Sequence, residues 1–146
     1  YWDLPDLWDA IEHSERSLRI AALSMQPEAD AGGAEWLLPP AILAAAARGV
    51  RVQVLVADWN KRPGRVEPLQ RLAEVKNVEV RFAVIPESSR GFQPFSRVAH
   101  SKLLVADERL AWIGTGNLSP DYFYESRNAG LLLQGEGPGR RLAAQF

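Results

Sequence analysis

Residues 100–117 read HSKLLVADERLAWIGTGN and contain two short apolar runs on either side of Asp107 and Glu108. Together with the residues just before them, these runs predict strands over 97–106 and 110–114. The turn between the two strands is too short for a crossover connection, so we expect an antiparallel hairpin. The hairpin decides the fold, because the rest of the chain has the rhythm of a parallel sheet.

Strands and helices are expected to alternate outside the hairpin. Apolar runs predict strands over 17–25, 50–57, 78–84 and 128–133. Helical patterns begin near residues 3, 40 and 68, and a further helix closes the chain. Such alternation is typical of helices packed on both faces of a sheet. With the hairpin added, the sequence predicts an α/β/α sandwich with a mixed sheet.

Local signals mark where several of these elements begin and end. Asp3 is a candidate N-cap for an amphipathic first helix. Gly49 is placed to end the second helix in a left-handed conformation. Residues 26–35 read as a loop. Asp58 and Trp59 follow a buried strand, at the carboxyl end where α/β sheets place ligands.

Composition limits the classes of function. The 146 residues suit one domain, and 47% of them are apolar, which is enough to build a core. A net charge of −1 gives no global attraction to nucleic acid or anionic lipid, so a phosphate ligand must meet a local patch. The absence of cysteine excludes disulfides, thiol nucleophiles and thiolate metal sites, and it leaves the compartment open. No stretch reaches the roughly 18 apolar residues of a membrane span, so we expect a soluble chain.

The ends of the chain also carry an expectation. The sequence starts at Tyr1 without methionine and stops at Phe146 inside a helical pattern. We therefore expect residues 1–146 to be a single domain excised from a longer chain. The alanine- and arginine-rich composition suits a bacterial source.

The groups that phosphodiester chemistry requires lie together in residues 100–117. On a strand, His100 and Lys102 project from the same face, so they can address one phosphate together. His100 offers a nucleophile or a proton donor, and Lys102 offers a cation for the nonbridging oxygens. The sequence therefore indicates a candidate active site.

The second half of this stretch supplies supporting groups. Gly114 and Gly116 let backbone approach a ligand closely, and Asn117 adds a side-chain N–H donor. We expect Asp107, at a strand end, to anchor the hairpin through hydrogen bonds to backbone or to a nearby arginine. A lone histidine or a GTGN turn is usually structural, but their fixed spacing together favours an active site.

Written as a pattern, the stretch is HxKx4Dx6GTxN, which resembles the HKD motif of the phospholipase D superfamily. The resemblance is strongest from about Trp36 to Leu133 and implies one half of a phospholipase D-like fold. It also implies a phosphodiesterase whose site combines two HKD motifs: one histidine attacks phosphorus and the other protonates the leaving group. The implied intermediate is a phosphohistidine, and neither metal nor cofactor is implied.

The motif occurs once in this chain, so the resemblance implies half a site. A second HKD half in the same chain or a homodimer would complete it. If this is the C-terminal half, the resemblance implies that His100 is the general acid. Many members place a glutamate where this sequence has Asn128, and Glu125 is the candidate to orient His100 instead.

Finer matches resemble the C-terminal half of the lysosomal 5′ exonuclease branch, which degrades single-stranded nucleic acid. The matching segments include Arg97-Val98, the strand that ends at Trp59, and residues 122–125. Trp59 could stack on a base while the basic residues of 61–65 follow the backbone, although a basic loop beside a core tryptophan gives the same pattern. Two alternatives remain open: a phospholipid hydrolase or phosphatidyl transferase, and a non-catalytic half kept for dimerisation or binding.

Overall fold

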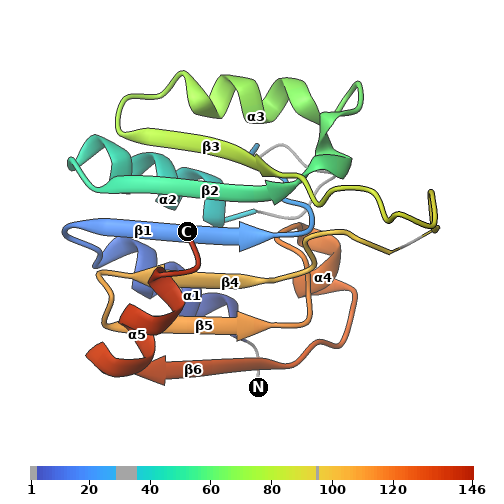
Figure 1. Ribbon diagram of the computed structural model, residues 1–146. Helices are drawn as coiled ribbons and strands as arrows, with labels where there is room; N and C mark the ends of the chain where they lie inside the picture. The colour runs from blue at the N-terminus through green and yellow to red at the C-terminus, as the bar shows by residue number, and fades with distance from the viewer. Residues whose placement is uncertain (1–2, 29–35, 95) are drawn as a thin grey trace.

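The computed structural model describes residues 3–28, 36–94 and 96–146, which form one six-stranded sheet in the order β3-β2-β1-β4-β5-β6 (Figure 1). The strands are β1 (Ser17–Ala22), β2 (Arg51–Ala57), β3 (Val78–Ala83), β4 (Leu103–Ala106), β5 (Leu110–Gly114) and β6 (Gly130–Gln134). The helices are α1 (Leu4–Glu12), α2 (Leu38–Ala47), α3 (Val66–Ala73), α4 (Pro120–Tyr124) and α5 (Glu136–Ala143), with a 3-10 turn η1 at Asp58–Lys61.

The sheet is mixed, as the hairpin predicts. β1, β2 and β3 are parallel, because α2 and α3 carry the chain back between them. β4 then pairs antiparallel with both β1 and β5, and β6 pairs antiparallel with β5. Ile20 in the middle of β1 lies opposite Val54 on one side and Leu104 on the other. The expected α/β/α sandwich with a mixed sheet is confirmed.

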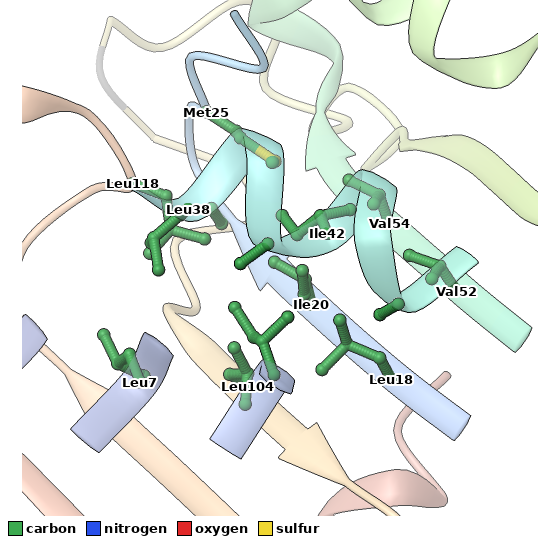
Figure 2. Packing of buried hydrophobic residues seen from close by; sticks show 14 of the residues in the cluster. Leu7, Leu18, Ile20, Met25, Leu38, Ile42, Val52, Val54, Leu104 and Leu118 are labelled. Carbon is green, nitrogen blue, oxygen red and sulfur yellow. The ribbon is translucent and has the colours of Figure 1, made fainter. Parts of the chain in front are cut away.

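The two faces of the sheet are covered unequally. The larger core lies under α1, α2 and α3, where Leu7, Ile42 and Leu104 are at most 1% exposed (Figure 2). Each such side chain contributes about 1.5–3 kcal/mol by leaving water. The opposite face carries a smaller core in which Val105 and Ala111 pack with α5. Figure 1 shows α5 in front of the sheet and α1 and α2 behind it.

The predicted helix ends are right at one position and wrong at another. Gly49 has a φ of +97°, so it follows α2 in the left-handed conformation that glycine adopts without a Cβ penalty. Asp3 does not cap α1 with its side chain. Its carboxylate accepts a 2.6 Å hydrogen bond from the indole Nε1 of Trp112, which lies far away in the sequence.

The strand predicted over 97–106 is wrong for its first six residues, since β4 begins at Leu103. Arg97 has a φ of +55°, which is incompatible with an extended strand. On the β1 side the pairing of β4 begins where Ala21 lies opposite Leu103, and on the β5 side one more hydrogen bond joins the Gly114 N–H to the Lys102 carbonyl. The strand predicted over 17–25 ends at Ala22, and Met25 pairs instead with Leu118 in a separate bridge. The sequence did not predict α4. Most of the loop expected over 26–35 lies outside the described residues.

Candidate active site

The candidate residues other than Asp107 lie at one edge of the sheet, which we call the site edge. The carboxyl ends of β1, β2, β3 and β5 lie at this edge, on the right in Figure 1. His100 and Lys102 precede β4 there, because β4 runs in the opposite direction. The N–H of Gly114 donates to the carbonyl of Lys102 at 3.0 Å, so the two halves of the motif are joined directly.

His100 and Lys102 are in contact although they are not on a strand. Lys102 Nζ lies 2.9 Å from both ring nitrogens of His100 and donates to the His100 carbonyl at 3.1 Å. The lysine is 4% exposed, whereas the histidine is exposed. Burial lowers the pKa of Lys102. The arrangement holds a cation beside an imidazole that solvent can reach.

Asn117 is buried at the same edge with an unused acceptor. It is 5% exposed, and within the described part of the chain its Oδ1 has no hydrogen-bond partner. The following residue fixes its position, because Leu118 exchanges backbone hydrogen bonds with Ser24 and Gln26 beyond the end of β1. An unpaired buried polar atom costs about 1–3 kcal/mol, which is tolerated most readily at a site where a ligand supplies the partner.

A cavity of about 700 Å³ opens beside Asn117. Its walls come from the segment after β1, from the loop after η1 and from α4. A volume of this order accommodates a ligand of nucleotide size. The lining includes Ser24, Glu28, Arg65, Asn117, Asp121 and Tyr122.

Packing explains why glycine occupies the two positions expected to approach a ligand. A Cβ on Gly114 would lie 2.1 Å from the indole of Trp112. A Cβ on Gly116 would lie 3.1 Å from Asn128 Cγ and 3.2 Å from Tyr122 Cβ. Both glycines therefore let the turn close against neighbouring side chains, and substrate binding by their backbone stays a prediction.

Asp107 lies at the opposite end of the hairpin from His100. Its carboxylate accepts hydrogen bonds of 2.8 Å from the backbone N–H groups of Glu15, Arg16 and Ser17. Burial alone would raise the pKa of Asp107, but these hydrogen bonds outweigh it and the pKa is lowered. The residue ties the hairpin to the start of β1 and supports the site from a distance.

Asn128 holds the GTGN turn rather than His100. Its Oδ1 accepts from Thr115 Oγ1 at 3.1 Å, and its Nδ2 donates to the Tyr122 carbonyl at 2.8 Å. Glu125 is exposed at the end of α4, and across the described residues its side chain forms no hydrogen bond with His100. An orienting role for Glu125 therefore stays a prediction.

Trp59 stands at the site edge in η1 and is 43% exposed. Its neighbour Asn60 is buried and donates to the carbonyls of Leu23 and Ala57 at 2.7 and 2.8 Å, which fixes the start of this loop. Trp59 is thus neither a core residue nor fully solvated. The sequence did not reveal Asn60, because a single asparagine in a polar loop gives no signal of burial.

No group of three or more histidine, aspartate or glutamate side chains could hold a metal ion in the ranges that the structure covers. In the same ranges, no helix has the length and apolar character needed to cross a bilayer.

Comparisons with known proteins agree on one family. A family model described as "Cardiolipin synthase, PLD-like domain" matches residues 7–146. Phospholipase D Y of Dictyostelium discoideum is 35% identical over 127 residues, which cover 83% of this chain and 29% of that protein. The human 5′-3′ exonuclease PLD4 is 37% identical over 107 residues, 68% of this chain and 21% of that protein. The chain thus spans less than a third of the length of these relatives.

Solved structures show the same fold. NucT from Helicobacter pylori superposes with a TM-score of 0.74 at 21% identity, covering 97% of this chain and 82% of that one. Nuc from Salmonella typhimurium, a phospholipase D family member, superposes with a TM-score of 0.72 at 18% identity and the same coverage. At this level of identity the two neighbours establish the fold alone.

Proposed function

The chain belongs to the phospholipase D-like family, and from that premise we propose that it supplies one half of a phosphodiesterase site for single-stranded nucleic acid. One observation carries the proposal. The exposed His100 touches the buried Nζ of Lys102 at the edge where Asn117 is buried and its amide oxygen has no partner among the described residues. A proton-transfer group, a cation and an amide at one edge are what a phosphodiester requires.

The proposed reaction has two steps. A histidine nitrogen of one half attacks phosphorus and forms an N–P bond, the P–O bond to the leaving group breaks, and the second histidine gives that oxygen a proton. Water then attacks the phosphohistidine, the N–P bond breaks, and the second histidine takes the proton from that water. Lys102 Nζ and the side-chain N–H group of Asn117 stabilise the nonbridging oxygens in both steps.

The second histidine comes from another HKD half, in the same chain or in a second copy. We assign His100 the role of general acid in a two-half site. Its imidazole is exposed, so it can face a partner half, while Lys102 stays fixed behind the reacting group. Glu125 remains the candidate for orienting His100 once that partner is in place.

Nucleic acid is preferred as the substrate because several relatives of this chain are nucleases by name. The 5′-3′ exonucleases PLD4 of mouse and human and PLD3 of Xenopus laevis are 36–37% identical to it over 94–107 residues. Trp59, partly exposed at the site edge, offers a face for a base. A phospholipid is the second candidate, favoured by the family description and by the phospholipase D names of other relatives.

The test uses the complete protein that contains this domain. It is incubated in EDTA with a labelled single-stranded oligonucleotide and, separately, with phosphatidylcholine vesicles. We expect cleavage of the oligonucleotide and its loss in His100→Ala, with Arg51→Ala, at the opposite end of β2, as the control. Cleavage of the lipid alone would reverse the order of the two candidates, and activity that survives His100→Ala would exclude the catalytic assignment.

The role of His100 is tested by trapping the intermediate. A p-nitrophenyl phosphodiester has a leaving group that needs no proton, so it should still react with the partner histidine in His100→Ala. An acid-labile, alkali-stable label should then accumulate on that histidine. No label in that variant, with normal labelling of the unaltered protein, would make His100 the nucleophile.

A further inference from the structure

We propose that the segment between β3 and His100 binds the single strand and that Phe92 is its aromatic platform. We call residues 84–94 and 96–97 the arm, which are the described residues of this segment. In Figure 1 the arm projects from the site edge, beyond the end of β3, and returns toward β4. The inference rests on the proposed function, since it assigns a holding surface to the same substrate.

The arm is folded in its own right. Arg97 Nε donates to the carbonyl of Pro86, which closes the base of the arm. Near the tip, the Gly91 N–H donates to the Ser88 carbonyl at 2.9 Å, and the Arg90 N–H donates to Ser88 Oγ at 3.2 Å. These hydrogen bonds fix the backbone of the turn that precedes Phe92, so binding need not order the whole segment.

Phe92 follows this turn and is 81% exposed. Its nearest neighbours along the chain are polar or small: Arg90, Gly91 and Gln93. Among the described residues of the arm, the other large exposed apolar side chains are Val84 and Ile85, which directly follow β3 and precede Phe92 by seven residues or more. A tip that enters a membrane would present contiguous apolar side chains, whereas a ring flanked by polar groups suits stacking on a base. Stacking is also tolerant of sequence, because every base has a π face.

The charge around the arm is complementary to a phosphate backbone. Residues 58–65 and 84–97 together contain five basic and two acidic residues in a chain whose net charge is −1. The two segments leave from neighbouring points, because Ala57 at the end of β2 pairs with Ala83 at the end of β3. The local excess of cations is thus concentrated at the site edge.

The surface is continuous with the site. The arm ends three residues before His100, and Arg65 of the basic loop lines the cavity that contains Asn117. A strand whose reacting phosphate lies at His100 can pass over the basic loop and reach the arm. Phe92 then holds a nucleotide outside the reacting one, so it should act on KM rather than on the chemical step.

The experiment measures cleavage of an oligonucleotide and of bis(p-nitrophenyl) phosphate by the complete protein. Phe92→Ala should raise KM for the oligonucleotide by about five-fold or more, as expected for a lost stacking contact, and leave hydrolysis of the small diester unchanged. Phe92→Trp should restore the unaltered KM. The control is Leu43→Ala, which removes a 41% exposed apolar side chain from α2.

A second variant tests the charge. Arg90→Gln should reduce the slope of log affinity against log salt by about 0.7, whereas Arg51→Gln at the far end of β2 should not change it. Suppose that the protein cleaves the oligonucleotide and that cleavage depends on His100. Unchanged oligonucleotide kinetics in Phe92→Ala would then overturn this inference and leave the proposed function intact. Weaker binding of Phe92→Ala to anionic vesicles with unchanged oligonucleotide binding would overturn it in favour of a membrane. If the complete protein does not cleave the oligonucleotide, the proposed function is overturned, and this inference falls with it.

Discussion

Lys102 Nζ lies 2.9 Å from both ring nitrogens of His100 while its own side chain is buried. The contact holds a cation at the site although burial disfavours the charged form. This burial lowers the pKa of Lys102. Lys102→Met keeps the length of the side chain and removes the charge. We expect loss of activity together with a gain of about 0.5–2 kcal/mol in the free energy of unfolding at neutral pH.

The pH dependence of stability provides a check on that variant. The pKa of Lys102 is lower in the folded state than in the unfolded state. The buried charge therefore lowers the free energy of unfolding of the unaltered protein at low and neutral pH. That cost is relieved as the pH rises from the folded-state pKa toward the unfolded value of about 10.4. Urea unfolding should therefore show stability rising with pH in that window for the unaltered protein and for the exposed-site control Lys76→Met, but not for Lys102→Met. A Lys102→Met protein less stable than both would contradict the account.

Asn117 and Asn60 are both buried, but their hydrogen bonding differs. Asn117→Ala removes an oxygen that has no partner in the described part of the chain, so stability should change by less than about 1 kcal/mol while kcat falls by about 10²–10³. Asn60→Ala breaks two hydrogen bonds to backbone carbonyls, so it should lose about 1–3 kcal/mol of stability. Urea titrations and initial rates distinguish the pair. The reverse pattern would make Asn117 a structural residue.

The glycines of the turn should differ in their sensitivity to alanine. Gly114→Ala places a methyl group against the buried indole of Trp112, so we expect a loss of about 1–3 kcal/mol in stability. Gly116→Ala meets Asn128 at a distance that small shifts relieve, so stability should hold while displacement of Asn128 lowers kcat. Gly137→Ala in α5 has open space and serves as the control. Equal melting temperatures for Gly114→Ala and this control would refute the packing explanation.

The sequence predicted the architecture because its signals are local. The apolar runs of β2 and β5 and the short turn at Asp107 and Glu108 each depend on a few neighbouring residues, and together they require a mixed sheet. The contact between His100 and Lys102 was also within reach, because a spacing of two brings side chains together even where the strand has not yet begun.

The rest of the site depends on distant partners. Asn117 is buried because Leu118 pairs with the segment after β1, more than 90 residues earlier. Glycine at 114 depends on where the Trp112 indole folds back, and no pattern in the sequence reveals that position. The left-handed φ of Arg97, at the start of the strand predicted over 97–106, could not be predicted either, because arginine does not signal that conformation.

Asp107 offers a test of the hairpin anchor that is independent of catalysis. Its lowered folded-state pKa means that the anchor contributes stability above the unfolded pKa of about 3.9 and loses it as the pH falls through the folded value. Asp107→Asn turns an amide donor toward three backbone N–H donors, so it should lose about 1–3 kcal/mol at pH 7. The variant should also show a weaker decline in stability during acid titration than the unaltered protein or the exposed-site control Asp9→Asn. Because the anchor lies at the end of the hairpin away from His100, kcat of the folded variant should stay within about two-fold of the unaltered value. A large loss of kcat with unchanged stability would instead place Asp107 in the chemistry.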